Sequence, residues 1–331
     1  LSLLCVCVGV FIVSAKRTPF GTYGGVLKDH SATDLAEHAA KAALVAGNVA
    51  PELVNSVIVG NVMQQRLSAV LLCVQRYRGN RYYYRSKSDQ HEKTNNWAGN
   101  MLMFHVEVNM KRLGIRFKND SFQKDCYGEA GHYNAEIAPI DVKAKKGKVS
   151  MTSDEHPRPQ TTLEQMAKLP SVFKKGGTVT AANASGVSDG AAAVVLASED
   201  ALKAHKLTPL ARIVAYHTSG CDPSIMGIGP VPAITEALKK AGLSLEDMDL
   251  VEVNEAFASQ YLAVAKALGL DPAKTNVNGG AIAIGHPLGA SGTRITAHLV
   301  HELRRRGGKY AVGSACIGGG QGIAIVLENT N

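Results

Sequence analysis

The chain has 331 residues, of which 45% are apolar and 19% are charged, so its composition is that of a folded globular protein and excludes a disordered one. Its net charge of +8 suits nucleic acid, a membrane surface or an anionic small molecule. Its six cysteines contain no Cys-x-x-Cys pair, which argues against a zinc site and against a disulfide framework. We therefore expect a reducing compartment.

The first elements are predicted from an apolar start. Leu1 to Val13 is shorter than the roughly 20 apolar residues of a membrane-spanning helix and lacks the basic segment of a signal peptide. We interpret Val10 to Ala15 as a buried strand. A helix follows, with its cap among Ser31 to Asp34 and its end at Gly47. Val57 to Val59 is predicted to be a short buried strand.

The same order of elements recurs in the second half of the chain. A strand is predicted over Ala211 to Tyr216, then a helix with Pro232 in its first turn and Gly242 at its end, then a strand over Leu250 to Val253. This indicates a weak internal duplication of a βαβ unit. Further helices are predicted over residues 255–268 and 293–306, and further strands over residues 309–315 and 322–327.

The segment between the halves has a different character. Arg66 to Arg85 is basic and aromatic, and Lys87 to Asn100 is polar with little periodicity. Interleaved arginine and tyrosine is one way to bind RNA. The alternatives are a segment that joins no core and an inserted foreign segment.

Three short motifs concentrate the candidate chemistry. Asn276 to Gly292 surrounds one histidine, His286, with five glycines and a following proline. Cys316-Ile-Gly-Gly-Gly follows an apolar strand, and Asn254-Glu-Ala-Phe ends another. Taken alone, each motif is more often a turn or a small buried residue. Taken together, they supply an acid/base pair and oxyanion donors.

In this order, the three motifs resemble the carboxyl-terminal half of the thiolases, and most of all the mitochondrial 3-ketoacyl-CoA branch of that family. The resemblance extends from about Thr152 to the end and over Phe11 to about Gln64, and it fails over residues 65–128. It includes these segments: Ala15-Lys-Arg-Thr-Pro-Phe-Gly, Glu155-His-Pro-Arg-Pro-Gln-Thr-Thr, Asn183-Ala-Ser-Gly-Val-Ser-Asp-Gly, Gly220-Cys-Asp-Pro and Gly227-Ile-Gly-Pro-Val-Pro.

The resemblance implies an α/β fold of two duplicated βαβ halves, with mixed sheets layered between helices. Residues 10–64 are then a partial N-terminal half, and residues 65–128 are an unmatched insert or an aberrant segment. Residues 129–180 are the remnant of a loop domain and its linker, and residues 181–331 are the C-terminal half. The first half is therefore expected to be incomplete, with an exposed sheet edge.

The implied activity is acyl transfer between a 3-ketoacyl-CoA and coenzyme A (CoA) in fatty-acid β-oxidation. By resemblance, His286 activates the nucleophile and Cys316 is the acid/base that protonates the departing acetyl-CoA carbanion. Asn254 holds a water, and Gly318 donates its backbone N–H to an oxyanion.

The resemblance also implies the binding partners. Arg158 and Thr161 match positions that contact CoA, and Ser185 matches a serine beside the pantetheine arm. CoA and acyl-CoA are expected as substrates, without a permanently bound cofactor, a metal or nucleic acid. A homo-oligomer without a transmembrane segment is expected, in the mitochondrial matrix, with the peroxisome and cytosol as alternatives.

One part of the family's machinery has no counterpart. The family's first cysteine lies in a Cys-Gly-Ser-Gly motif, which occurs nowhere in this chain. Cys73 lacks an adjacent glycine, and Cys126 lies downstream of the nucleophile's place. We therefore expect that the chain forms no acyl-enzyme. A non-catalytic acyl-CoA-binding protein, a partner for a complete thiolase subunit, and wrongly joined exons over residues 65–128 are the alternatives.

Overall fold

The computed structural model describes residues 9–62, 131–144 and 147–331. Their main sheet has six strands in the order β6-β1-β7-β10-β9-β8. Neighbouring strands are antiparallel except β8 and β9, which are parallel. The strands are β1 (Val10–Arg17), β6 (Ala192–Ser198), β7 (Ala211–Gly220), β8 (Leu250–Val253), β9 (Tyr310–Ile317) and β10 (Gln321–Asn329). The sheet is mixed, as predicted.

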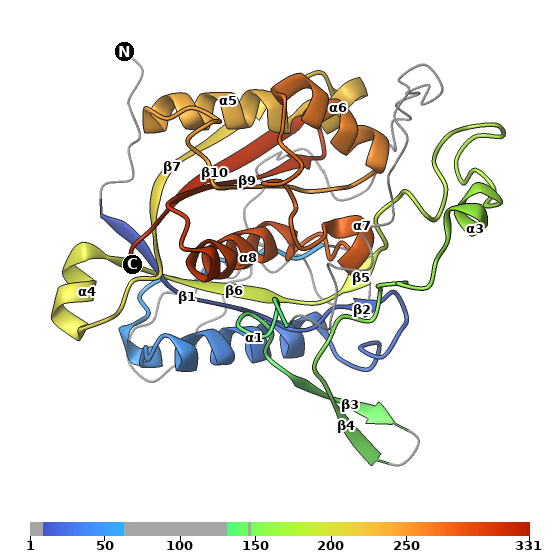
Figure 1. The fold of residues 1–331 in the computed structure, drawn as a ribbon. Helices are drawn as coiled ribbons and strands as arrows, with labels where there is room; N and C mark the ends of the chain where they lie inside the picture. The colour runs from blue at the N-terminus through green and yellow to red at the C-terminus, as the bar shows by residue number, and fades with distance from the viewer. Residues whose placement is uncertain (1–8, 63–130, 145–146) are drawn as a thin grey trace, which may run out of the picture.

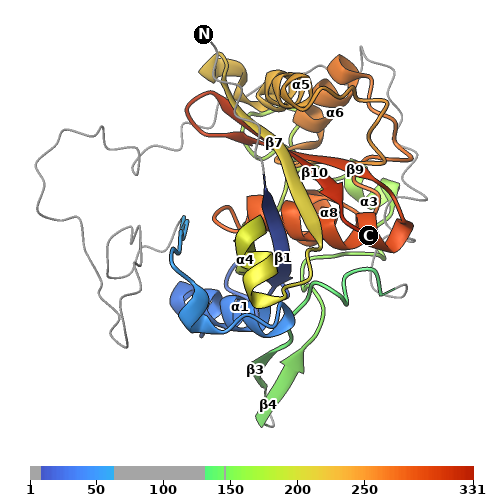
Figure 2. The same cartoon turned by 90° about the vertical axis from the view of Figure 1, so that its left-hand side faces the viewer.

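Helices lie on the outer sides of this sheet and in the middle of the molecule. Figures 1 and 2 show α5 (Pro230–Ala241) and α6 (Ala258–Leu268) on one side, and α1 (Ala32–Ala46) on the other. Between them lies α8 (Ser291–Arg306), which contacts β1 and β6 at one end of the strand order and β8, β9 and β10 at the other. The predicted layering of sheet between helices is confirmed.

The central helix α8 is buried on nearly all sides. Its Ile295, Leu299 and Leu303 pack with Ile12 of β1 and Leu250 of β8 in one core cluster. Because one cluster contains residues of α8, of β1 and of β8, α8 joins both ends of the sheet into one core.

The helix α1 forms where its sequence predicts it. Ser31 accepts a hydrogen bond from the backbone N–H of Asp34, and the Asp34 carboxylate accepts one from the Ser31 N–H, which completes a capping box. Leu35, Ala39 and Ala43 form its buried face. The helix ends at Gly47, as predicted.

The matching helix α5 confirms the predicted repeat only in part. Pro230 begins α5, and Gly242, with φ of +69°, ends it in the left-handed conformation that glycine adopts without strain. The strands on either side form as β7 and β8. The prediction of a buried strand over Val57 to Val59 is wrong, because Val57 makes only a single β-bridge and Ile58 is 85% exposed. An apolar run is buried only where another element covers it.

Two further boundaries differ from the prediction. The helix predicted from residue 255 begins at Ala258, because Phe257 is extended and forms a β-bridge with Ala184. The two C-terminal strands extend farther than predicted, so that Cys316 is the last but one residue of β9 rather than the residue after it.

Smaller elements surround the layers. In Figures 1 and 2 a hairpin of β3 (Ile140–Ala144) and β4 (Gly147–Met151) projects from the body, and α3 (Leu163–Ala167) lies on a separate arm. The others are β2 (Gly21–Thr22), β5 (Ser188–Asp189), α4 (Glu199–His205), α7 (Ala281–Ile284) and the short 3-10 helices Pro51–Leu53 and Pro223–Ile228.

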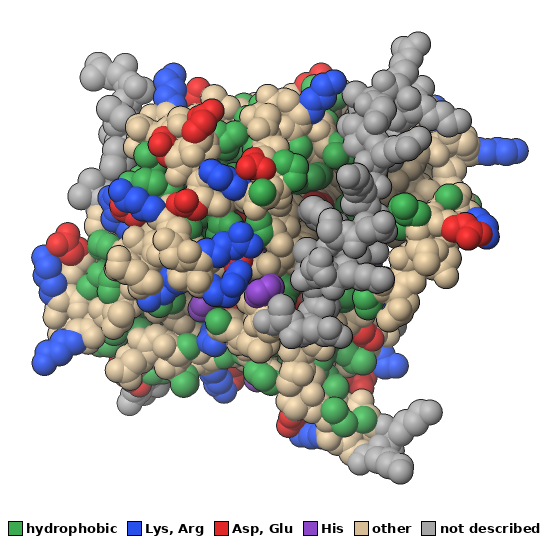
Figure 3. Space-filling model, viewed as in Figure 1, with side chains coloured by type: hydrophobic (Ala, Val, Ile, Leu, Met, Phe, Trp, Pro, Cys, Tyr) green, Lys and Arg blue, Asp and Glu red, His purple; other side chains and the backbone are tan. Residues whose placement is uncertain are grey.

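The exterior of the molecule carries charges of both signs. On the face shown in Figure 3, basic and acidic side chains are interspersed over the described residues, with no separate basic field. No helix in the described part of the chain is long and apolar enough to cross a membrane. Within the described residues, β6 and β8 are the edge strands of the six-stranded sheet. The segment 65–128, with the arginine-rich residues 66–85, lies outside them.

Candidate active site

The site is built on two parallel strands that end at the same edge of the sheet. The last residue of β8, Val253, lies opposite Ser314 of β9, and the Asn254 N–H donates to the Ser314 carbonyl at 2.9 Å. Cys316 lies two residues farther along β9. Asn254 and Cys316, which are 62 positions apart in the chain, are therefore brought to one end of the sheet by a single strand pairing.

His286 reaches this edge from a loop that is fixed on both sides. Gly285 before it has φ of +100°, and a Cβ there would lie 2.2 Å from Ser188 Oγ, so no other residue fits without rearrangement. The His286 N–H donates to the Gly186 carbonyl at 2.9 Å, and Val187 forms a β-bridge with His286. The imidazole is thus presented by a rigid backbone, as its glycine-rich surroundings predict.

The two ring nitrogens of His286 have different neighbours. Nε2 lies 3.4 Å from Asn254 Nδ2, and Nδ1 lies 2.6 Å from Ser291 Oγ at the start of α8. Burial, assisted by the positive charge of Arg294, lowers the pKa of His286 to about 4. The imidazole is therefore neutral at pH 7 and can accept a proton.

The side chain of Asn254 is 1% exposed, and its Oδ1 atom is buried without a hydrogen-bond partner among the described residues. Buried polar atoms in proteins are normally paired with protein groups or with ordered water. Oδ1 is therefore suited to hold a water beside His286, which is the role that the resemblance implies.

Glu255 ties the loop of His286 to the end of β8. Its carboxylate accepts hydrogen bonds from Asn276 Nδ2 at 2.8 Å and from the Ile282 N–H at 3.2 Å. A Cβ at Gly280 would lie 2.3 Å from the same carboxyl carbon. Burial raises the pKa of Glu255. The residue next to Asn254 in sequence thus also holds the loop that presents His286.

Cys316 is a protonated thiol at neutral pH. Burial raises its pKa to about 11, with a smaller contribution from Cys221. Cys221 and Cys316 are both free thiols. A thiol with so high a pKa is a poor spontaneous nucleophile, whereas it suits a group that gives a proton to a carbanion.

The glycines after Cys316 form a tight turn with an open face. Gly319 and Gly320 have φ of +86° and +82°, and a Cβ at Gly320 would lie 2.5 Å from the Cys221 carbonyl oxygen. At Gly318, by contrast, a Cβ would meet no atom within 4 Å. Gly318 is therefore free for a ligand to approach, as an oxyanion donor requires.

The residues expected to contact CoA lie on two segments. Ser185 joins the Asn254-Glu-Ala-Phe motif, because its N–H and its Oγ–H both donate to the Ala256 carbonyl, at 3.0 and 2.9 Å. Arg158 and Thr161 lie on the arm before α3. The Arg158 guanidinium is exposed, and its Nη1 donates to the carbonyls of its own loop, at Glu155, His156 and Pro157.

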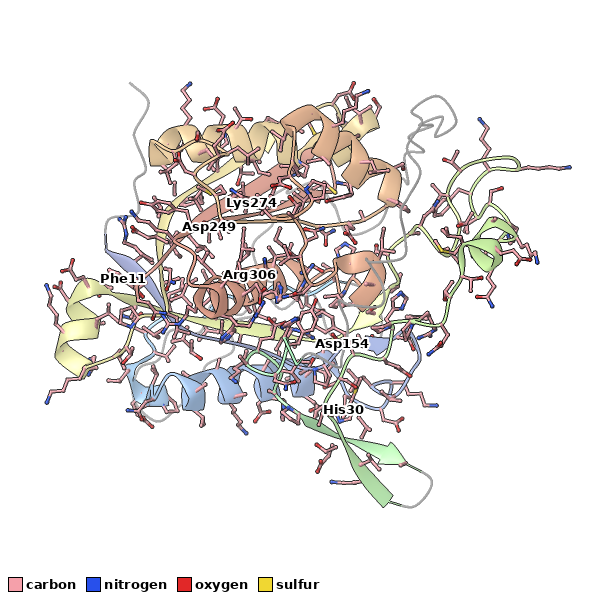
Figure 4. All side chains as sticks on the ribbon, in the orientation of Figure 1. Phe11, His30, Asp154, Asp249, Lys274 and Arg306 are labelled. Carbon is pink, nitrogen blue, oxygen red and sulfur yellow. The ribbon has the colours of Figure 1, made fainter. Side chains whose placement is uncertain are left out.

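A buried ionic network contacts the glycine-rich loop of His286. Arg17 at the end of β1 donates to Asp154 through both terminal nitrogens, at 2.7 and 3.0 Å, and to Glu136 through Nε at 2.5 Å. Figure 4 labels Asp154. Burial opposes ionisation, but Arg17 and His298 lower the pKa of Glu136 to about 2. His298 lies 3.2 Å from Asn278 Nδ2, within the loop of His286.

The structure thus brings His286, Asn254, Cys316 and Ser185 to one end of the sheet. Cys73 and Cys126 lie outside the described residues. Within the described ranges no cluster of three metal-binding side chains occurs. Three further residues act on these groups and have no role in the sequence prediction: Glu255 and Ser291, which are hydrogen-bonded to the loop and the ring of His286, and Arg294, whose charge helps to lower the pKa of His286. Ser291 had a sequence signal, because it is the only hydroxyl residue between Asn276 and Gly292.

Comparison with known protein families places both halves. The model described as thiolase, C-terminal domain, matches residues 207–329. The model described as thiolase, N-terminal domain, matches residues 10–73 and 123–200. The interruption between residues 73 and 123 lies within the segment where the sequence resemblance fails.

Comparison with individual proteins gives the same family. The chain is 55% identical to mitochondrial 3-ketoacyl-CoA thiolase of Mus musculus, with 97% of this chain and 98% of the relative covered. It is 54% identical to the Homo sapiens protein, at the same coverage. The Mus musculus alignment spans 395 positions, more than the 331 residues of this chain, so the relative has residues that this chain lacks.

Two solved structures confirm the fold. A crystal structure of human mitochondrial 3-ketoacyl-CoA thiolase in complex with CoA is 52% identical, with a TM-score of 0.84, over 97% of this chain and 98% of that one. The structure of acetyl-CoA acetyltransferase from Syntrophomonas wolfei is 30% identical, with a TM-score of 0.82 and coverage of 97% and 99%. The chain belongs to the thiolase family.

Proposed function

We propose that this chain carries the acyl-CoA site of a 3-ketoacyl-CoA thiolase, the acyltransferase that moves acyl groups between a 3-ketoacyl-CoA and CoA in fatty-acid β-oxidation. The single observation behind the proposal is the joint placement of a neutral His286 and the buried Asn254 at the end of β8, beside Cys316. The names of its relatives support the mitochondrion as its location.

Each residue in the site has a chemical task that suits its environment. His286 is suited to accept the proton of an acyl-accepting thiol, because burial keeps the imidazole neutral. Cys316, with its raised pKa, is suited to give a proton to the carbanion of a departing acetyl-CoA. A water held by Asn254 Oδ1, together with His286, faces one oxyanion, and the Gly318 N–H faces the other. CoA enters past Ser185, Arg158 and Thr161.

We propose further that this chain alone does not form the acyl-enzyme. The reaction needs a thiolate in the first half that takes the acyl group, and no Cys-Gly-Ser-Gly motif occurs in the sequence. Cys316 does not replace it, because a thiol with a pKa of about 11 is almost wholly protonated at pH 7. The chain would then bind acyl-CoA without completing the transfer.

Intact-mass spectrometry after incubation with acetyl-CoA tests this second proposal. The expected result is an unchanged mass for the full chain and for a Cys316→Ala variant, with a known thiolase acylated in parallel. A stable adduct on the full chain that hydroxylamine removes would contradict it. If the adduct persisted in Cys316→Ala, another cysteine would be the nucleophile.

A second candidate function is a non-catalytic acyl-CoA-binding protein or a partner of a complete thiolase subunit. The observation that favours it is the interrupted match to the N-terminal domain beside a full match to the C-terminal domain. Titration calorimetry with CoA tests the binding, and Ser185→Trp, which fills the space beside Ala256, should abolish the heat. Absence of heat with the full chain would remove both the acyl-CoA site and the acyl-CoA-binding alternative, and would leave only the pairing with a complete subunit. Sedimentation of the chain alone tests whether it forms a homo-oligomer.

A further inference from the structure

One hydroxyl group contacts the Nδ1 side of the His286 ring. Ser291, the first residue of α8, is 4% exposed, and its Oγ lies 2.6 Å from His286 Nδ1 and 3.0 Å from the Pro287 carbonyl oxygen. A hydroxyl has one proton to donate and two lone pairs to accept with. Its two neighbours therefore decide which way each bond runs.

Only one arrangement makes both contacts favourable. The Pro287 carbonyl accepts and never donates, so a 3.0 Å contact with Oγ is attractive when the Ser291 proton lies between the two oxygens. Oγ then has lone pairs for His286, and Nδ1–H donates to it at 2.6 Å. In the reverse arrangement Oγ–H donates to Nδ1, one hydrogen bond is lost, and the lone pairs of two oxygens face each other.

We propose that Ser291 is a positioning residue that fixes His286 as the Nδ1–H tautomer and so directs the Nε2 lone pair toward Asn254 and the ligand. This inference deepens the proposed function, because it rests on His286 as the group that accepts a proton there. The neighbour on the other side is compatible with it, since Asn254 Nδ2 can donate to Nε2 at 3.4 Å.

The local backbone makes this control rigid. Ser291 belongs to α8, which is packed between both halves of the sheet, and its N–H also donates to the Pro287 carbonyl at 2.9 Å. The backbone of His286 is fixed by the hydrogen bond that its N–H donates to the Gly186 carbonyl. Neither partner can move away without disturbing the core, so the tautomer is set by the fold before any ligand arrives.

Nitrogen NMR of the full chain labelled with 15N-histidine tests the proposal. The expected spectrum at pH 7 has a protonated Nδ1 and an unprotonated Nε2 for His286, assigned by the signal that disappears in His286→Gln. In Ser291→Ala, Nδ1–H loses its acceptor and the Nε2–H tautomer should gain population. Ser291→Thr keeps the hydroxyl and should restore the Nδ1–H form.

Ser314→Ala is the matched control, because Ser314 is also buried and donates to a carbonyl, that of Ile323 at 2.7 Å, without contacting His286. It should leave the tautomer unchanged. A wild-type spectrum with Nε2–H, or an unchanged tautomer in Ser291→Ala, would overturn the proposal. Failure of the proposed function gives a different result, which is no CoA binding in calorimetry whatever the tautomer.

Discussion

The two halves of the molecule, taken as the matches to the N-terminal and C-terminal thiolase domains up to residue 200 and from residue 207, begin alike and then differ. In each half a strand, β1 or β7, is followed by a helix, α1 or α5, and pairs with a later antiparallel strand, β6 or β10. Beyond β10 the second half continues with β9 and β8, whereas β6 is the edge of the described sheet. Asn254 and Cys316 lie at the ends of those two additional strands. The candidate site is thus built by the part of the second half that the described first half lacks.

The first half has fewer strands in the described sheet and still contributes to the common core. The strand β1 packs against α8 through Ile12 and Ala15, and Arg17 at its end anchors the loops before α3. The first half therefore stabilises α8 and the loops around the site through packing and ion pairs.

The largest effect is expected at the buried network of the first half. Arg17→Ala leaves Asp154 and Glu136 buried without their cation and should cost about 3 to 5 kcal/mol of unfolding free energy. Urea unfolding measures it. The control is Arg212→Ala, whose partner Glu328 is partly exposed, with an expected loss of about 1 kcal/mol or less. Equal losses in the two variants would show that the network adds nothing.

The helix between the halves should respond almost as strongly. Leu299→Ala creates a cavity where α8 meets both parts of the sheet and should cost roughly 2 to 5 kcal/mol. Leu196→Ala on the edge strand β6, where the side chain is 51% exposed, should change stability by about 0.5 kcal/mol or less. A single unfolding transition in both variants would show that the halves unfold together; two transitions would separate them.

Acid should lower the unfolding free energy through His286, in the second half. Because burial lowers the pKa of His286 to about 4, the unfolded state binds the proton first as the pH falls. Stability from the neutral imidazole is complete above pH 6.5 and is lost as the pH falls toward 4. Between pH 7 and 4.5 we expect His286 to account for about 2 kcal/mol of the loss. Urea unfolding at a series of pH values gives the unfolding free energy of wild type and of His286→Gln. As the pH falls, this free energy should decrease more steeply in wild type, and parallel pH dependences would contradict the assignment.

The smallest effect is expected at the cap of α1. Ser31→Ala removes the acceptor for the Asp34 N–H and one side of the capping box, and should cost about 1 kcal/mol. Ser31→Asp keeps an acceptor and should recover most of the loss. Thermal unfolding of the three proteins measures this. A loss in Ser31→Ala as large as that of Leu299→Ala would mean that α1 is the weak point of the first half.

The sequence predicted the elements whose signals are local. The apolar face and capping residues of α1, and the Pro and Gly at the ends of α5, mark these helices without knowledge of the fold. The strand at Val57 to Val59 was predicted wrongly, because burial depends on a neighbour that composition does not reveal. The same limit explains why Glu255 and Arg294 were missed, since their partners lie more than 20 residues away in sequence.

The site shows the same contrast between local signals, which the sequence reveals, and contacts between distant residues, which it does not. His286, Asn254 and Cys316 were singled out by glycine-rich or strand-ending motifs, and the structure places them at one end of the sheet. Their order in space, however, comes from the parallel pairing of β8 with β9 and from the bridge between Val187 and His286, which no local pattern encodes.

The most direct test of the account is a thiolysis assay with a 3-ketoacyl-CoA and CoA, performed on the full chain beside calorimetry with CoA alone. The account predicts heat of CoA binding, which the site in the second half explains, and no CoA-dependent cleavage above the uncatalysed rate. CoA-dependent cleavage above the uncatalysed rate would contradict this expectation, because it would show that the chain supplies its own acyl-accepting group.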